Sequence, residues 1–424
     1  MLLEFSCKNY KSIKNEIVFS TIASTDDTHE EELKQFSNFR VLRTAAIYGP
    51  NGSGKSNFIN AIKFMKDLVI NSVKNQPGDM VYQSPHKKSN IDIPSEFNIQ
   101  FVKDNIRYAY GFSLKENLIY EEYLYFFPKG RQVKIFERTN LDVKLGNKYK
   151  NNKVLTETKE NKLKNNRLFL SCAANETNIK EIERVFLFFS EDIVIYNSDI
   201  NDWRNYSIKL MQQNKGVKQL FIKILQHLGT GIKDIKVKYE EKMTNNDVNV
   251  NANDHLGILK DIEKILMAFN VKHEVKIIYD EFETDLDEES KGIQKLFEIV
   301  CPIIDALKYG KIMIFDEIEI GLHESIAYNI IQIFKNYKSD EFAQLIFTTH
   351  DTGLLDSNMF RRDEIWFTEL DKERSTDLYS LLEIKNVRKG ENIAKGYILG
   401  RYGAIPVLNR DFSEIFNSIN DGGM

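Results

Sequence analysis

The sequence predicts an α/β fold with an antiparallel β lobe and a mainly helical insertion. Three observations lead to this fold class. A glycine-rich loop lies between a buried strand and a helix at residues 41–70, strands rich in Tyr and Phe follow at 95–127, and two more buried strands appear only after residue 310. Because core-type strands recur at both ends of the chain, the two halves of the core are expected to flank a long insertion.

Composition limits the class of protein. The chain has 424 residues, 42% hydrophobic and 28% charged, which suits two or three domains or one large domain with an insertion. The net charge of −4 argues against a chain whose main task is to neutralise nucleic acid, although local basic patches survive that average. No apolar run approaches the roughly 18 residues that span a membrane, and the N-terminus alternates like a pair of strands rather than a signal peptide. Cys7, Cys172 and Cys301 are scattered without a C-x-x-C, as expected for reduced core thiols in a cytoplasmic protein.

The glycine-rich loop, IYGPNGSGKSN at residues 47–57, fits the phosphate-binding pattern G-x-x-x-x-G-K-[ST] at every fixed position. Lys55 is expected to neutralise the β- and γ-phosphates, and the Ser56 hydroxyl to ligate Mg²⁺. The helix predicted at 56–70 would add its N-terminal dipole to the site. The sequence therefore predicts a nucleotide site formed by Gly49, Asn51, Gly52, Gly54, Lys55, Ser56 and Asn57.

The middle of the chain is less informative. Residues 144–167 carry eight Lys or Arg against two Glu, which is typical of a solvated hairpin or mobile loop, with a nucleic-acid-facing arm as the alternative. Helical spacing appears at 217–229 and 257–270, separated by an Asn-rich loop at 244–254. No heptad pattern persists over three repeats, which excludes a long coiled-coil rod.

Two acidic residues follow a buried strand in the second half. The run GKIMIFDEIEIGLH at 310–323 predicts a Walker B strand that delivers Asp316 to the Mg²⁺ shell, while Glu317 polarises the attacking water as general base. The run AQLIFTTHDTGLLD at 343–356 predicts another buried strand, whose tip carries His350 as a γ-phosphate sensor. Each has a simpler alternative, a helix cap for the acidic pair and an ordinary surface or core role for the histidine. The glycine-rich loop, the acidic pair and the histidine come in this order after consecutive strands of one sheet. Together they predict one nucleotide site.

The spacing between these motifs narrows the class of nucleotide-binding protein. Lys55 and Asp316 are 261 residues apart, far more than in a compact GTPase or kinase. No N-K-x-D guanine motif occurs, which favours ATP over GTP.

The chain resembles the ABC-type ATPases of the SMC and DNA-break-repair class. Within that class it is similar to the AAA-family ATPases of abortive-infection and anti-phage systems, such as AbiL-type ATPases and relatives of the OLD proteins. The segments that carry the resemblance bracket nearly the whole chain and are EFSCKNYKSI, AAIYGPNGSGKSN, EESKGIQKLF, IFDEIEIGLH, IFTTHDTGLLD and GRYGAIPVL. Gly321-Leu322-His323 replaces the Leu-Asp usual in the SMC class and favours the defence-type relatives.

The resemblance implies ATP and Mg²⁺ bound between two protomers of a homodimer or higher homo-oligomer. Ser290 and Gly292 would act in trans as a signature loop at a helix N-terminus, although the sequence departs from L-S-G-G-Q and an N-cap serine is the alternative. Lys11 lies where the class places a residue near the nucleotide, or is an exposed loop lysine. Gln100 is a weak candidate for the Q-loop.

Two functions remain open from the sequence. The first is an ATP-driven sensor or scaffold of an anti-phage pair that controls a separate effector, a Toprim-type nuclease or another toxin. The second is an SMC-like DNA-repair or DNA-tethering ATPase that acts on nucleic acid directly. Only 74 residues follow His350, too few for a Toprim domain plus the last ATPase elements, so the effector is expected on another polypeptide. The expected domain ranges are 1–115 and 286–424 for the two halves of the ATPase core and 116–285 for the rest of the β lobe and the helical insertion.

Overall fold

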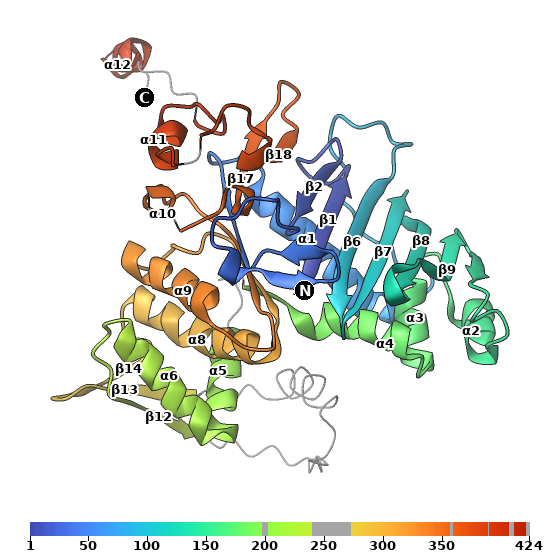
Figure 1. The fold of residues 1–424 in the computed structure, drawn as a ribbon, viewed down its shortest axis with the longest axis horizontal. Coiled ribbons are helices and arrows are strands. Elements are labelled where there is room, and N and C mark those ends of the chain that lie inside the picture. The colour runs from blue at the N-terminus through green and yellow to red at the C-terminus, as the bar shows by residue number, and fades with distance from the viewer. Residues whose placement is uncertain (197–201, 240–272, 357–358, 389, 407–410, 421–424) are drawn as a thin grey trace. The chain divides into compact units, whose positions relative to one another are not determined.

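The computed structural model describes residues 1–196, 202–239, 273–356, 359–388, 390–406 and 411–420 (Figure 1). The chain divides into two compact units, one of Met1–Ile193 with Leu345–Met424 and one of Val194–Gln344. These boundaries differ from the three ranges expected from the sequence. The helix predicted at 257–270 and the Asn-rich loop at 244–254 lie outside the described residues.

A seven-stranded antiparallel sheet forms one part of the first unit, and Figure 1 shows strands β1, β6, β7 and β8 side by side. Its order is β10-β9-β8-β7-β6-β1-β2. The strands are β1 (Leu2–Lys8), β2 (Ile17–Ser20), β6 (Ser95–Lys103), β7 (Ile106–Lys115), β8 (Leu118–Phe127), β9 (Val133–Thr139) and β10 (Asp142–Leu145). Asp104-Asn105 and Glu116-Asn117 close the β6–β7 and β7–β8 hairpins with positive φ at both residues, as two-residue turns require. The strands predicted between 2 and 20 and between 95 and 127 are therefore confirmed.

A second group of strands in the first unit is parallel at its centre. Strand β5 (Thr44–Tyr48) pairs in parallel with both β16 (Gln344–Thr348) and β17 (Ile365–Leu370), and β18 (Thr376–Ser380) extends β17 antiparallel. All five residues of β5 are buried, in keeping with the continuous apolar runs of parallel strands covered on both faces. Helix α1 (Lys55–Asn71) follows β5 and buries Phe58, Ile62 and Met65 on one face. The carboxyl ends of β5 and β16 therefore lie at the same edge.

The basic stretch 144–167 is the expected hairpin only at its start, where Lys144 and Leu145 pair with β9, and it continues as helical turns rather than as a loop. After β10 it forms helix α2 (Lys153–Glu157) and a π-helical turn at Thr158–Lys162. Leu155 and Leu163 are buried, and Lys148 pairs with Glu181 at 2.6 Å. The apolar residues are spaced too sparsely to show helical periodicity, but they suffice to dock the segment onto α3 (Phe169–Glu176) and its neighbours.

An ion pair without solvent access lies beneath this segment. The guanidinium of Arg138 donates to Glu122 at 3.2 Å, and both side chains are 0% exposed. Glu122 also accepts hydrogen bonds from the backbone N–H groups of Phe169 and Leu170 at the start of α3 and from the Tyr110 hydroxyl. Because a buried charge is tolerated only when paired and hydrogen-bonded, this cluster fixes α3 on the antiparallel sheet.

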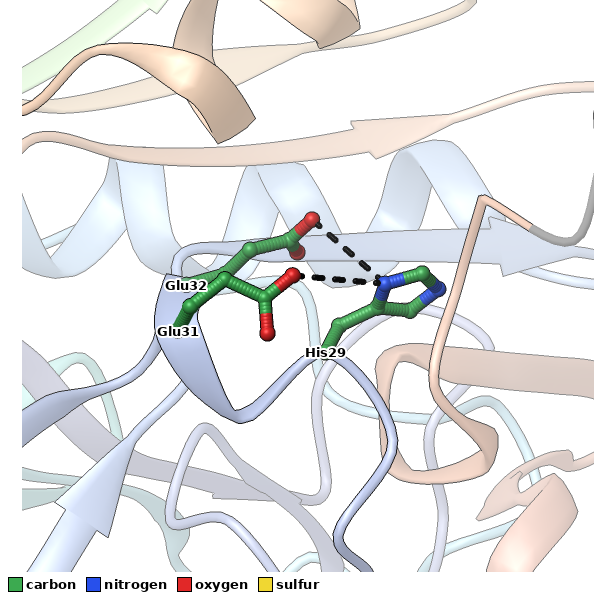
Figure 2. A group of neighbouring side chains, drawn as sticks. All are labelled: His29, Glu31 and Glu32. Carbon is green, nitrogen blue, oxygen red and sulfur yellow. Dashed lines mark ion pairs between the residues drawn. The ribbon is translucent and has the colours of Figure 1, made fainter.

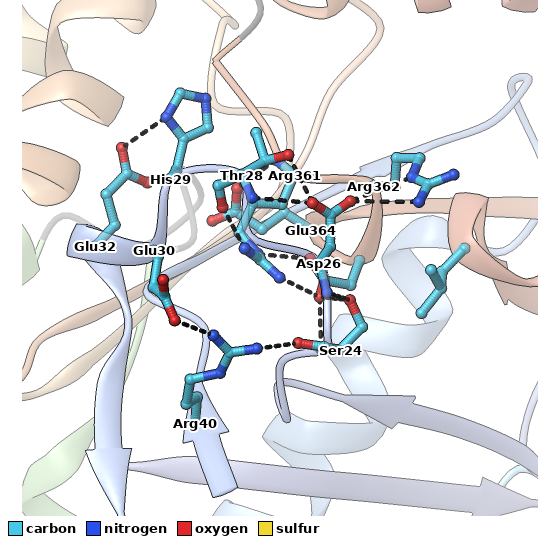
Figure 3. Close-up of polar contacts among 12 residues, drawn as sticks. Ser24, Asp26, Thr28, His29, Glu30, Glu32, Arg40, Arg361, Arg362 and Glu364 are labelled. Atoms are coloured by element: carbon cyan, nitrogen blue, oxygen red, sulfur yellow. Dashed lines mark hydrogen bonds and ion pairs between the residues drawn. The ribbon is translucent and has the colours of Figure 1, made fainter. Parts of the chain in front are cut away.

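A network of charges joins the segment after β2 to the start of β17 (Figure 3). Arg361, which is 1% exposed, makes a two-pronged ion pair with Asp363, whose carboxylate accepts from Ser24 N and Oγ at 2.7 and 2.6 Å. Arg362 donates to Asp26. Burial raises the pKa of Asp26, but hydrogen bonds from Thr28 and the two arginine charges outweigh it and lower the pKa to about 2.

The second unit combines helices with two small groups of strands. Strand β11 (Ile193–Tyr196) lies beside β15 (Ile312–Phe315), and β12 (Asp234–Tyr239), β13 (His273–Ile278) and β14 (Glu283–Asp285) form an antiparallel sheet that the sequence did not predict. Helix α8 (Lys291–Tyr309) packs against α5 (Asp202–Gln213) and α6 (Lys215–His227), and α6 confirms the helix expected at 217–229. Helix α9 (Glu324–Asn336) follows β15.

The remaining described elements are short. They are β3 (Lys34–Phe36), β4 (Phe39–Val41), α4 (Lys180–Leu187), α10 (Gly353–Asp356), α11 (Ile393–Ile398) and α12 (Ser413–Asn420). Within the described residues, no helix has both the length and the apolarity needed to cross a membrane. Cys7, Cys172 and Cys301 are buried free thiols, as expected.

Candidate nucleotide-binding site

The phosphate-binding loop connects β5 to α1 through three glycines with positive φ. Gly49, Gly52 and Gly54 have φ of 157°, 77° and 107°. A Cβ at Gly54 would collide with the Thr376 side chain, and one at Gly49 with the Thr368 carbonyl. Gly49 and Gly54 therefore require glycine for both conformation and space, whereas Gly52 requires it for conformation alone. Asn51 and Gly52 are exposed at the tip of the loop, and Ser56 is exposed in the first turn of α1.

Lys55 lies folded back across this loop. Its ammonium donates to the carbonyl oxygens of Gly49 and Pro50 at 2.8 and 3.2 Å, and the residue is 5% exposed. The loop backbone thus holds a cation at the N-terminal end of α1, where exposed N–H groups and the helix dipole also favour an anion. This donor set fits a phosphate group.

Hydroxyl groups from three other segments brace the loop from behind. The Thr376 hydroxyl bonds Ser12 Oγ at 2.7 Å and donates to the Ser53 carbonyl at 2.9 Å. The Ser53 hydroxyl in turn bonds Thr368 Oγ1 at 2.6 Å. Asn57, predicted to touch the nucleotide, donates its amide to Ser12 at 2.7 Å and so belongs to this brace. No local sequence pattern marks Ser12, Thr368 and Thr376, because these residues are distant from the loop along the chain and meet it only after folding.

His350 lies at the same edge as the loop. Thr348 pairs with Ile47, and the Thr349 N–H donates to the Ile47 carbonyl at 3.1 Å, so the chain leaves β16 next to the point where β5 enters the loop. His350 follows directly and is exposed. The Asp351 carboxylate accepts from the N–H of Gly353, the first residue of α10, at 2.8 Å. Parallel pairing of β5 and β16 thus brings together the predicted loop and the predicted histidine.

The acidic pair belongs to the second unit. All four residues of β15 are buried, and Asp316 and Glu317 follow it half-buried. Glu317 has φ 56°, in the left-handed region that a side chain with Cβ rarely adopts. The Ile320 N–H donates to the Glu317 carbonyl at 3.1 Å and closes a turn around it. Residues kept in such conformations cluster at functional sites.

The proposed signature residues stand at the start of α8. Ser290 is the N-cap, and its hydroxyl accepts from the Ile293 N–H at 3.3 Å, so the capping role considered from the sequence is present. A Cβ at Gly292 would lie 2.9 Å from the Gly321 carbonyl, which places the helix start against the loop after Glu317. The N-terminus of α8 and the acidic loop therefore form one local structure.

Two weaker candidates have other partners. Lys11 has φ 50°, and its ammonium lies 5.6 Å from the centre of the Tyr10 ring, while burial lowers its pKa. Gln100 lies inside strand β6 and donates to Glu4 at 3.0 Å, so it does not lie in a loop.

One group of side chains in the described residues resembles a metal site. Figure 2 shows His29 facing the carboxylates of Glu31 and Glu32. The distances from His29 Nδ1 to these two carboxylates are 3.9 and 3.8 Å. The three ligand atoms lie within 4.8 Å of one another, whereas ligands of a tetrahedral zinc ion lie roughly 3.4 Å apart. Burial lowers the pKa of Arg43, and the nearby Glu32 carboxylate acts in the opposite direction. We therefore assign the contacts of His29 with Glu31 and Glu32 as ion pairs and assign no metal to these residues.

A family model described as "AAA domain, putative AbiEii toxin, Type IV TA system" matches residues 45–356, from β5 to α10. A comparison with curated proteins gave no match. Similar solved structures include an SMC head bound to the C-winged helix domain of ScpA, with 15% identity, a TM-score of 0.46, and coverage of 89% of this chain and 97% of that one.

Two further SMC heads are also similar. The SMC head domain from Thermotoga maritima shares 13% identity at a TM-score of 0.41, covering 89% of this chain and 98% of that one. An SMC head with an extended coiled coil, bound to the C-terminal domain of ScpA derived from Pyrococcus furiosus, shares 13% identity at a TM-score of 0.40, covering 89% and 96%.

Proposed function

Since the chain belongs to the AAA-domain family described as "putative AbiEii toxin, Type IV TA system", we propose that it binds and hydrolyses ATP with Mg²⁺ and serves as the sensor or scaffold of an anti-phage system. The observation that carries the ATPase part is the braced loop around Lys55. Its glycines, its buried lysine and the N-terminus of α1 are the groups that would bind the phosphate anion. A residue with a Cβ does not fit at Gly54, because the Cβ would collide with the Thr376 side chain.

The roles of the residues follow from their chemistry. Lys55 exchanges its carbonyl partners for phosphate oxygens, and Ser56 and Asp316 are the oxygen ligands proposed for Mg²⁺. When bound, Mg²⁺ would neutralise charge on the phosphates. Glu317 takes the proton of the attacking water, and His350 contacts the terminal phosphate. Ser290 and Gly292 complete the site of a second protomer, so the working form is a homodimer or higher homo-oligomer.

The defence role rests on the family description, which names a toxin and a toxin–antitoxin system. We propose, as the resemblance to anti-phage ATPases implies, that ATP binding or hydrolysis controls a separate effector, a Toprim-type nuclease or another toxin. Coexpression of the chain with the product of its neighbouring gene, followed by phage plating, tests this part. Protection that needs the neighbour and an intact Lys55 supports it, and protection by the chain alone contradicts it.

Replacing Lys55 with Ala is the direct test of nucleotide binding. Because hydrogen bonds to a charged group contribute about 1.5–3 kcal/mol, ATP affinity should fall by about 10- to 100-fold. Calorimetric titration with MgATP measures the loss, and thermal unfolding without nucleotide checks that the fold is kept. Lys63→Ala is the matched control, since Lys63 lies on the same helix α1 and pairs with Asp67 rather than with the loop. Unchanged ATP affinity in the Lys55 variant would contradict the assignment.

Direct action on DNA remains a second candidate because the folded stretch 144–167 presents exposed lysines. These are Lys144, Lys148, Lys150, Lys153, Lys162 and Lys164. Lys144 lies on β10, Lys153 on α2 and Lys162 on the π-helical turn, while the other three lie between or just after these elements, so the lysines belong to a folded segment rather than to a mobile arm.

Salt dependence of DNA binding tests this surface. The logarithm of the affinity should fall with the logarithm of salt at a slope of about −0.9 for each phosphate contacted. Reversing the charges of Lys144, Lys150, Lys153 and Lys164 should make that slope less negative by up to about 3.6 units. Reversing Lys87, Lys88, Lys129 and Lys372, also exposed in the first unit, is the control. No binding, or equal slopes in both variants, excludes this surface as a DNA contact.

A further inference from the structure

We propose that Lys295 is a positioning residue that couples the start of α8 to the loop carrying Glu317, so that contact of Ser290 and Gly292 with a second protomer's nucleotide is transmitted to the general base of the same chain. This inference rests on the proposed function and adds a means of regulation to it. It requires that the helix start and the acidic loop move together.

The first observation is a pair of hydrogen bonds that Lys295 makes with this loop. Lys295 lies in the second turn of α8, is 9% exposed, and donates from Nζ to the carbonyl oxygens of Ile318 and Ile320 at 3.0 and 2.6 Å. These two carbonyls lie one and three residues after Glu317. A single cation therefore holds both sides of the turn that Glu317 begins.

The second observation is the close approach of two glycines. The position of a Cβ on Gly292 lies 2.9 Å from the Gly321 carbonyl, and Gly321 itself has φ 73°. Any larger residue at 292 would push this loop away. Together with the Lys295 bonds, the contact joins the first two turns of α8 to residues 317–321 at two points.

The third observation is the charge surrounding the ammonium. Burial lowers the pKa of Lys295 to about 8, and the carboxylates of Glu319, Glu298 and Glu317 act in the opposite direction. The Tyr196 ring lies 5.7 Å from Nζ, and the Tyr196 hydroxyl donates to Glu298 at 2.7 Å. A buried ammonium is costly unless it is paired and hydrogen-bonded, and here the compensation comes from the loop that carries the base.

These contacts give the coupling a direction. Glu317 occupies a left-handed conformation that the surrounding structure must hold in place. If the helix start is fixed by a phosphate of the second protomer, Lys295 and Gly292 fix the loop, and the Glu317 carboxylate keeps its place. Without that contact, the loop can leave the productive geometry while the P-loop still binds ATP.

The test is Lys295→Met, which retains most of the volume and removes the donor. The kcat for ATP should fall by about 10- to 100-fold, as expected for a catalytic group displaced by about 1 Å, while KM and ATP-dependent assembly stay unchanged. Lys295→Arg should restore part of kcat because it keeps a charged donor. Lys308→Met, which removes an exposed lysine from the same helix, is the control and should turn over ATP normally.

The outcomes separate this inference from the proposed function. If the wild-type protein neither binds nor hydrolyses ATP, the proposed function fails. If the wild type hydrolyses ATP and Lys295→Met has the same kcat at a temperature well below its unfolding transition, the coupling is wrong and Lys295 only stabilises the fold. If Lys295→Met changes KM and kcat together, or loses assembly, the residue acts on binding rather than on the base, which also overturns the inference.

Discussion

Replacing Glu317 with Gln is expected to lower ATP turnover by about 10²- to 10⁴-fold while ATP binding is retained. The amide keeps the size of the side chain and its left-handed backbone but cannot accept the proton of the attacking water. Lys55, Ser56 and Asp316 are unchanged, so the phosphate and Mg²⁺ contacts proposed for them remain. Turnover is measured as phosphate release, and binding by calorimetric titration with MgATP. Normal turnover by the variant would remove Glu317 from the role of general base.

The same variant also tests the shared site. A ligand that binds only the closed assembly stabilises that assembly by mass action, so ATP that is not hydrolysed should hold protomers together. Light scattering of Glu317→Gln with ATP should show a larger species, and adding Ser290→Arg should abolish it. Assembly that ignores ATP in a variant unable to hydrolyse it would mean that the P-loop acts within one chain.

The sequence could predict those parts of the site that are written in consecutive residues. The pattern from Gly49 to Ser56 identifies the loop because its glycines, lysine and hydroxyl must follow one another along a single turn. The buried strands before Asp316 and His350 are recognisable because parallel strands covered on both faces are continuously apolar. Alternating aromatic residues identified β6, β7 and β8 for the complementary reason, since one face of an antiparallel sheet differs from the other.

What the sequence could not predict depends on residues that meet only after folding. Thr376 and Ser12 are far apart along the chain, and nothing in either neighbourhood shows that their hydroxyls meet behind Gly54. The left-handed conformation of Glu317 is imposed by the turn that follows it, while the residue type favours no such conformation. The helix in the basic stretch escaped prediction because its stability comes from a few buried residues such as Leu155 rather than from periodicity.

The buried ion pair of the first unit leads to the largest expected effect on stability. Replacing Glu122 with Gln should destabilise this unit by about 3–5 kcal/mol, because Arg138 would keep its charge without a carboxylate partner. The NH2 of the new amide would also face a group that already donates, the N–H of either Phe169 or Leu170, because these two bond different oxygens of Glu122. Denaturant unfolding of the first unit measures the change in its free energy of unfolding. Glu121→Gln, at the exposed neighbouring position of β8, is the matched control.

A double variant distinguishes the ion pair from simple crowding at this position. Arg138→Met removes the buried cation, so combining it with Glu122→Gln should cost less than the two single changes added together. The remaining loss would come from the Arg138 bonds to the carbonyls of Asn140, Lys164 and Arg167, which position the end of the basic stretch. Additive costs would show that the two charges do not stabilise one another. In that case α3 is held on the sheet by its buried apolar residues, and the carboxylate contributes only its hydrogen bonds to the backbone.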